Sequence, residues 1–159
     1  MPRIDRATPA DFLAVAALDR EAWSDNAHAT YIPDGEHVWR IWCEHALTYV
    51  ARGKEGRIDG VVLAFPCVEP SCYCLHKIMV RHDARGQGIA PQLMAALLID
   101  IDRLGADLFL TVDPANAKAI NLYERWGFTD RSFVAGYYRP EEDRLILTRK
   151  GILRAPTPE

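Results

Sequence analysis

A glycine-rich turn at Arg85–Ala90 carries residues suited to phosphate binding. It reads Arg-Gly-Gln-Gly-Ile-Ala and lies between an apolar strand-like run, Leu75–Val80, and an apolar helical run. A turn that enters a helix leaves unpaired backbone N–H groups at the positive end of the helix dipole, where phosphate or pyrophosphate binds. Gly86 and Gly88 let a ligand approach the backbone, and Arg85 adds a charge-assisted contact. An alternative is that the glycines serve only the geometry of the turn.

Two common nucleotide-binding motifs do not fit this turn. A P-loop ends in Gly-Lys-Ser/Thr, whereas Gly88 is followed by Ile89. A Rossmann fingerprint follows the first strand of its domain and has a third glycine where this chain has Pro91. The turn lies mid-chain, after several strand-like runs, so we set both motifs aside.

A different pair of motifs does match. Arg85, Gly88 and Ala90 satisfy the pattern Gln/Arg-x-x-Gly-x-Gly/Ala, and residues 116–128 read Asn-Ala-Lys-Ala-Ile-Asn-Leu-Tyr-Glu-Arg-Trp-Gly-Phe. In order and spacing these segments resemble the two signature segments of the GNAT family, the acetyl-CoA-dependent N-acetyltransferases. The resemblance extends over nearly the whole chain.

The resemblance implies one α+β domain over residues 1–153, in which about four helices flank a mixed sheet of six to seven strands. In that family the fourth and fifth strands splay apart, and acyl-CoA lies in the gap. The hydrophobic pattern agrees with this order of elements. Helices are expected from Thr8 onward and at Glu36–Ala46, Gly88–Leu104 and Asn116–Trp126, with an irregular stretch at Trp23–Asp34. Strands are expected at Arg3–Arg6, Thr48–Arg52, Ile58–Cys67, Cys74–Arg81, Leu108–Val112, Phe128–Tyr138 and Leu145–Arg149.

Composition excludes several other classes. The chain has 159 residues and a net charge of −3, which argues against a nucleic-acid-binding surface. No apolar run has the length of a membrane span, and the first residues lack the apolar core of a signal peptide, so we expect a cytoplasmic protein. The four cysteines lack zinc-finger spacing and are expected to be reduced, and residues 154–159 to form a disordered tail. The cysteines are Cys43, Cys67, Cys72 and Cys74.

The resemblance also implies where acetyl-CoA binds. Its pyrophosphate would rest on Arg85–Ala90, and its pantetheine arm would pair with the backbone of Met79–Arg81 and with Asn116. A backbone N–H near Val80 would bind the thioester carbonyl as negative charge develops there. The residues expected to contact the cofactor are Met79, Val80, Arg81, Arg85, Gly86, Gln87, Gly88, Ile89, Ala90, Asn116, Ala119 and Tyr123.

Amine acetylation requires a base and an acid. An alkylamine has a pKa of about 10.4, so a base must deprotonate it, and a thiol has a pKa of about 8.5, so an acid assists thiolate departure. Tyr123 occupies the family's tyrosine position, about two helical turns after Asn116 on one helix face, and is the expected acid. The alternative is that Tyr123 only packs its helix onto the sheet.

His76 is the expected base, because some arylalkylamine-type relatives carry a histidine at this place on the fourth strand. Alternatively, His76 is a strand histidine hydrogen-bonded to a nearby carbonyl, and a water molecule acts as the base. Cys74, two residues earlier, would face the same way. His82 is expected to be a surface residue.

The acceptor is the least determined part of the prediction. The C-terminal half resembles the RimI-like N-terminal acetyltransferases of bacterial ribosomal proteins, both in Leu-Tyr-Glu-x-x-Gly-Phe and in Tyr-Tyr-x-x-x-Glu-Asp from Tyr137 onward. This favours a peptide α-amine. That subfamily commonly has a glutamate where this chain has Thr111, and its absence favours a polyamine, amino acid or antibiotic. The predicted substrate contacts are Trp23, Tyr31, Cys74, Thr111, Tyr137 and Tyr138.

Three further questions stay open at this point. Acidic side chains near the expected acceptor site would attract an amine, or would simply be solvated; they are Asp25, Asp34, Glu36, Glu141 and Glu142. The tryptophans could line a pocket, fill the core or form a subunit contact of a homodimer; they are Trp23, Trp39 and Trp42. A non-catalytic acyl-CoA-binding module would keep the phosphate turn but would need neither Tyr123 nor His76. No metal, nucleic-acid or membrane partner is expected.

Overall fold

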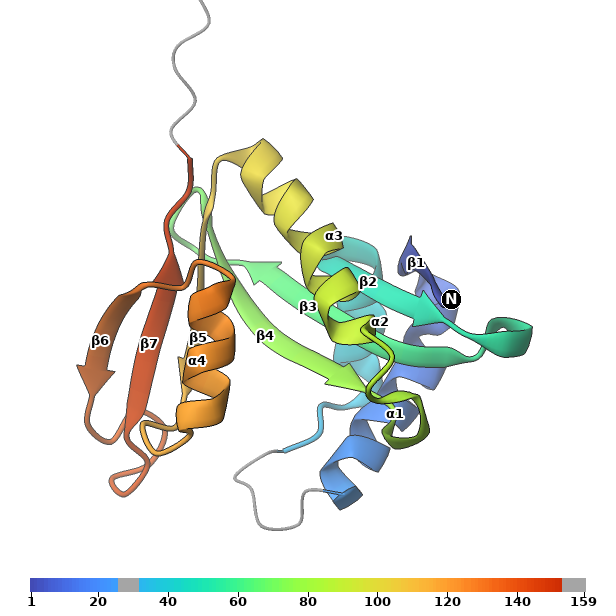
Figure 1. The fold of residues 1–159 in the computed structure, drawn as a ribbon, viewed down its shortest axis with the longest axis horizontal. Coiled ribbons are helices and arrows are strands. Elements are labelled where there is room, and N and C mark those ends of the chain that lie inside the picture. Colours follow the sequence, from blue (N-terminus) through green and yellow to red (C-terminus); the bar gives the residue numbers. More distant parts are fainter. Residues whose placement is uncertain (26–31, 153–159) are drawn as a thin grey trace, which may run out of the picture. The chain divides into compact units, whose positions relative to one another are not determined.

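The computed structural model describes residues 1–25 and 32–152, and in these ranges seven strands form one sheet in the order β1-β2-β3-β4-β5-β7-β6 (Figure 1). The strands are β1 (Arg3–Arg6), β2 (Leu47–Arg52), β3 (Ile58–Pro66), β4 (Cys72–Val80), β5 (Asp107–Val112), β6 (Asp130–Val134) and β7 (Arg144–Arg149). The α-helices are α1 (Phe12–Asp25), α2 (Glu36–His45), α3 (Ile89–Leu104) and α4 (Ala117–Arg125). None of the helices in these ranges combines the length and the apolar character that a membrane span requires. The expected fold class, strand number and helix number are confirmed.

The chain divides into two compact units, which are described separately. The first comprises Met1–Phe65 and His76–Asp100, and the second comprises Pro66–Leu75 and Ile101–Glu159, each within the described ranges. Strand β4 and helix α3 each begin in one unit and end in the other.

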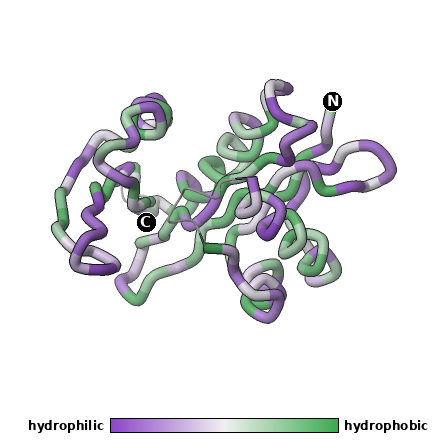
Figure 2. The backbone as a smooth tube through the Cα atoms, turned by 90° about the horizontal axis from the view of Figure 1, so that it is seen from below, coloured by the Kyte–Doolittle hydropathy of each residue, from purple (hydrophilic) through white to green (hydrophobic). Residues whose placement is uncertain are grey.

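In the first unit, β3 has helices on both of its faces. Val61 and Leu63 are fully buried in a core shared with α1 and α2, whereas Gly60 lies against Ile89 and Leu93 of α3. A strand covered on both faces reads as a continuous apolar run rather than an alternating one, which explains the sequence of β3. The β2–β3 turn, at the far right of Figure 2, is by contrast hydrophilic.

In the second unit, β4 pairs with β5 in parallel, and β5 pairs with β7 antiparallel. The β4–β5 pairing is confined to Cys72–Cys74 opposite Asp107–Phe109, as the expected splay of these strands requires. Helix α4 begins after Asn116, whose side chain accepts a hydrogen bond of 3.1 Å from the Ala119 N–H, the geometry of an N-cap. Beyond the helix, Phe128 is fully buried.

Two local expectations need correction, and one open alternative is decided. Helix α1 extends to Asp25, so Trp23 is helical rather than part of an irregular stretch, because good helix formers precede it. Strand β6 ends at Val134 rather than at Tyr138, because Gly136 has a φ of +58° and starts a loop. Trp39 is fully buried in the core of the first unit. Tyr31 and the tail 154–159 lie outside the described residues.

Candidate active site

The glycine-rich turn Arg85–Ala90, called the phosphate turn below, joins the end of β4 to α3 and offers a row of hydrogen-bond donors. Gly86 has a φ of +76° and Gly88 a φ of +73°, both in the region that favours glycine, and a Cβ on Gly86 would meet no atom within 4 Å. Within the described ranges, no backbone or side-chain acceptor takes a hydrogen bond from the N–H groups of residues 86–90. Pro91, which follows, has no N–H. The turn therefore fits a pyrophosphate at the N-terminus of a long helix.

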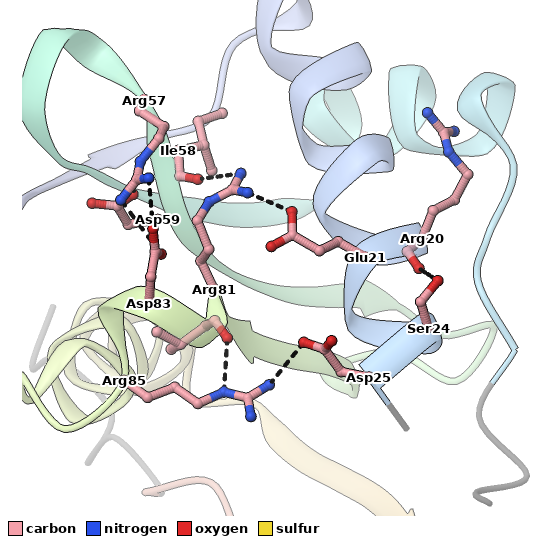
Figure 3. Close-up of polar contacts among 11 residues, drawn as sticks. Arg20, Glu21, Ser24, Asp25, Arg57, Ile58, Asp59, Arg81, Asp83 and Arg85 are labelled. Carbon is pink, nitrogen blue, oxygen red and sulfur yellow. Dashed lines mark hydrogen bonds and ion pairs between the residues drawn. The ribbon is translucent and has the colours of Figure 1, made fainter. Parts of the chain in front are cut away.

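Close packing holds this turn against β3. A Cβ on Gly60 would lie 3.0 Å from Cγ2 of Ile89, so any other residue at this position would require the Ile89 side chain or α3 to shift by a few tenths of an ångström. Arg57 adds an ionic anchor, with 2.6 Å from its Nε to Asp59 and 2.9 Å from its Nη1 to Asp83 (Figure 3). Asp83 lies in the short 3-10 helix that opens the turn, so these contacts position the N–H donors.

The two arginines of this region already have partners. Arg85 donates from Nε to the Val80 carbonyl at 3.3 Å, and its guanidinium lies 3.9 Å from Asp25 at the end of α1 (Figure 3). The Arg81 guanidinium is bonded to Glu21, and its backbone N–H donates to the Asp59 carbonyl at 2.8 Å. The backbone N–H of Arg81 is therefore already hydrogen-bonded to β3. His82 is exposed, as expected.

His76 lies on β4 and is bonded to a carboxylate rather than to a carbonyl. Its Nε2 lies 2.9 Å from Oδ2 of Asp34. Its ring centroid lies 5.1 Å from that of Trp42 and 5.7 Å from that of Phe65, and these two aromatic rings are stacked on each other. Burial opposes ionisation of Asp34, but hydrogen bonds from His76 and Lys77 outweigh it, so the pKa of this carboxyl is lowered.

The buried ion pair of Lys77 and Asp19 holds Asp34 in position. Lys77 lies 2.6 Å from Asp34 and 2.8 Å from both carboxylate oxygens of Asp19, which is fully buried. Asp19 also accepts hydrogen bonds from the Asp34 N–H at 2.8 Å and from the Trp39 indole at 2.9 Å. Sequence reasoning missed Asp19 and Lys77, because a helical Asp and a strand Lys carry no spacing signal that pairs them.

In the second unit, Tyr123 combines packing with an available hydroxyl. Its ring centroid lies 6.0 Å from that of Trp126 and 5.8 Å from that of Phe128. Burial raises the pKa of Tyr123, so its hydroxyl is protonated at neutral pH. No group among the described residues hydrogen-bonds this hydroxyl, which leaves it able to donate.

The β6–β7 loop holds the predicted acceptor residues of this unit. Oγ1 of Thr111 on β5 lies 2.9 Å from the Tyr138 hydroxyl, and the Arg144 guanidinium lies 5.1 Å from the Tyr138 ring centroid. The rings of Tyr137 and Tyr138 meet edge to face at 4.7 Å. This loop and β5 therefore bring three of the predicted substrate-binding residues together.

Cys74 lies near this loop as a protonated thiol. Burial first, and then the neighbouring Cys67 and Cys72, raise the pKa of Cys74 to about 12. Cys67 and Cys74 in turn contribute to raising the pKa of Tyr137, after burial and Tyr138. No group of three or more metal-ligating side chains occurs in the described part of the chain.

The acidic residues mostly serve the fold. Glu142 is buried and pairs with Arg139 and with Arg144, and Asp143 accepts a hydrogen bond of 2.9 Å from the Gly136 N–H. The other acidic residues expected near the acceptor site are Asp25, Asp34, Glu36 and Glu141. The first three have basic partners, and Glu141 is exposed. Of the acidic residues that the sequence analysis considered for attracting an amine, Glu141 therefore fits that role best.

Comparisons with known proteins identify relatives in sequence and in fold. The chain is 35% identical over 77 residues to the [ribosomal protein bS18]-alanine N-acetyltransferase of Escherichia coli K12, a match covering 46% of this chain and 52% of that protein. The chain thus spans about half the length of the curated relatives it matches.

Solved structures share the fold over nearly its full length. The ribosomal-protein-S18-alanine N-acetyltransferase of Escherichia coli superposes with a TM-score of 0.79 at 22% identity, covering 100% of this chain and 99% of that one. A diaminobutyrate acetyltransferase from Paenibacillus lautus, in complex with its substrate and coenzyme A, gives a TM-score of 0.74 at 17% identity, covering 98% of each chain. The profile of the acetyltransferase (GNAT) family matches residues 12–128, the span from the start of α1 to the end of the second signature segment. The chain therefore belongs to the GNAT family of acetyltransferases.

Proposed function

We propose that this protein transfers the acetyl group of acetyl-CoA to a primary amine by direct attack, with both substrates bound together. The observation that carries the proposal is the phosphate turn, where two glycines with positive φ and the N–H groups of residues 86–90 fit a pyrophosphate. Acetyl-CoA supplies an activated thioester.

His76 and Tyr123 take the proton-transfer roles in this reaction. The nitrogen of the neutral amine forms a bond to the thioester carbon, the carbon–sulfur bond breaks, His76 takes the one proton that this nitrogen loses on becoming an amide, and Tyr123 gives one to the departing sulfur. The products are an amide and coenzyme A. A backbone N–H near Val80 stabilises the charge that develops on the carbonyl oxygen, and one such donor is worth about 3 kcal/mol.

We further propose that the acceptor is a peptide α-amine. The Tyr137–Tyr138 turn supports this, as does the 35% identity to an enzyme named for acetylating an alanine of a ribosomal protein. Thr111 supports a second candidate, a small free amine, because threonine stands where RimI-like enzymes commonly carry a glutamate.

The first experiment measures thiol release from acetyl-CoA with a panel of acceptors. The panel contains a short peptide with a free N-terminal alanine, spermidine, free amino acids and an aminoglycoside, and the same peptide with a blocked N-terminus is the control. Release with the free peptide alone would support the first candidate, and release with small amines alone would support the second. If acetyl-CoA raises the melting temperature but no acceptor works, a non-catalytic acyl-CoA-binding module replaces the enzyme proposal.

A further inference from the structure

We propose that Asp34 is the positioning residue of a carboxylate–imidazole pair, and that it determines which ring nitrogen of His76 takes the proton from the amine. The inference rests on the proposed function, in which His76 is the base. It adds a residue from the segment before α2 that has no place in the signature motifs.

The hydrogen bond between the two side chains fixes the tautomer of His76. Nε2 of His76 lies 2.9 Å from Oδ2 of Asp34. An ionised carboxylate only accepts hydrogen bonds, so Nε2 must carry the hydrogen and Nδ1 must carry the lone pair. Among the described residues, no group forms a hydrogen bond with Nδ1 of His76. The nitrogen that accepts a proton is therefore Nδ1.

Asp34 is itself held in place from two sides. Its carboxylate lies 2.6 Å from Nζ of Lys77, and its backbone N–H donates to Oδ2 of Asp19 at 2.8 Å. Lys77 is bound in turn by both oxygens of Asp19, whose side chain is fully buried. The charged groups that surround His76 in the first unit are thus Asp34, then Lys77, then Asp19. This chain of contacts ties the carboxylate to α1 and β4.

Aromatic packing fixes the plane of the imidazole. The His76 ring lies 5.1 Å from Trp42 of α2 and 5.7 Å from Phe65 of β3, tilted by 56° to each. Its side chain keeps 33% of its exposure, so the ring is packed but accessible. A base needs this combination, because proton transfer requires an oriented lone pair that a substrate can reach.

A purely structural ion pair is the competing explanation, and a spectroscopic readout separates the two. In ¹⁵N-histidine-labelled protein, the neutral form of the His76 ring is expected to give the shifts of a ring protonated at Nε2. In Asp34→Asn the amide can donate as well as accept, so the Nδ1-protonated tautomer becomes populated and the shifts move toward each other. Glu44→Gln, which removes an exposed carboxylate of α2 that pairs with Arg40, is the matched control and should leave the shifts unchanged.

Activity is measured with whichever acceptor of the panel releases thiol fastest. Asp34→Asn is expected to lower kcat by about 10²- to 10⁴-fold, the usual contribution of a correctly protonated base, and Glu44→Gln should leave kcat within twofold. His76→Gln is expected to lose a similar factor. The double variant Asp34→Asn/His76→Gln should lose no more than His76→Gln alone, because Asp34 acts through His76.

The outcomes separate the two proposals. If His76→Gln keeps full activity, His76 is not the base and the proposed mechanism fails, whatever the spectra show. If His76→Gln is impaired but Asp34→Asn keeps both the tautomer and the activity, the role of Asp34 is overturned while the base assignment stands. If Asp34→Asn adds its full loss to His76→Gln, or lowers the melting temperature enough to account for that loss, Asp34 is a structural residue only.

Discussion

Oγ1 of Thr111 lies 2.9 Å from the hydroxyl oxygen of Tyr138, which links the middle of β5 to the β6–β7 loop. Thr111 also pairs with Ile146 across β5 and β7, so its backbone position is fixed by the sheet. A hydroxyl pair at this place can bind a neutral or cationic group but cannot remove a proton at neutral pH. We therefore propose that Thr111 takes part in acceptor recognition and that another residue is the base.

Replacing Thr111 by valine should weaken acceptor binding without affecting acetyl-CoA. The change keeps the shape of the side chain and removes one hydrogen bond, worth about 0.5–1.5 kcal/mol, so KM for the acceptor should rise about two- to tenfold. Steady-state kinetics with both substrates varied measures this. Thr129→Val, at an exposed position after α4, is the control. A change in KM for acetyl-CoA instead of the acceptor would contradict the assignment.

Tyr123→Phe should remove the proton donor and leave the affinity for coenzyme A unchanged. Turnover is expected to fall about 10²- to 10⁴-fold, while the affinity for coenzyme A, measured by calorimetry, stays within a factor of about two. Burial raises the pKa of Tyr123, so its hydroxyl keeps its proton to a higher pH than an exposed tyrosine would. In the unaltered protein, loss of turnover through ionisation of Tyr123 should therefore occur at a higher pH than the ordinary pKa of tyrosine would give. An earlier loss that persists in Tyr123→Phe belongs to another group.

Gly88→Ala should weaken coenzyme A binding. A Cβ at a φ of +73° costs about 1–2 kcal/mol of backbone strain and projects where an anion approaches the N–H donors, so the dissociation constant should rise at least about tenfold. Gly105→Ala, at a φ of +61° just after α3, carries comparable strain away from the turn and serves as the control. Equal loss of affinity in both variants would mean that strain, and not the turn, governs binding.

Lys77→Met should destabilise the first unit strongly. It leaves the fully buried carboxylate of Asp19 without its ammonium partner, a loss of about 3–5 kcal/mol that corresponds to a melting temperature lower by about 6–20 °C. Lys54→Met, in the exposed β2–β3 turn, is the control. The double variant Lys77→Met/Asp19→Asn should recover part of the loss, since the uncompensated charge is gone. Additive losses would show that the two side chains do not act as a pair.

The sequence predicts the elements well where glycine and proline mark their ends. Helix α3 ends at Leu104 before Gly105, which has a φ of +61°, and β3 ends at Pro66. In α2 the pattern is less informative, because apolar residues occur around the helix. Trp39 is fully buried there, whereas Ile41 is 55% exposed, and spacing alone favours neither face.

The site is predictable as individual residues but not as pairs. The phosphate turn, Asn116 and Tyr123 follow from motifs that are local in sequence. The partner of His76 is 42 residues away, and the partner of Thr111 is 27 residues away. Periodicity indicates which face a side chain occupies, and only the tertiary fold determines what it meets there. For the same reason, the role of Glu142 as a buried ion-pair partner could not be distinguished from that of a surface charge.

The contact between Trp42 and His76 gives this protein an intrinsic optical reporter. A positive charge on an imidazole whose ring centroid lies 5.1 Å from that of an indole changes the electrostatic field at the indole and so alters its emission. Tryptophan fluorescence followed against pH, with Trp42→Phe as the blank, would therefore report when this one ring gains its proton. The side chain that orients the ring thus also lets its charge be monitored in solution without a label.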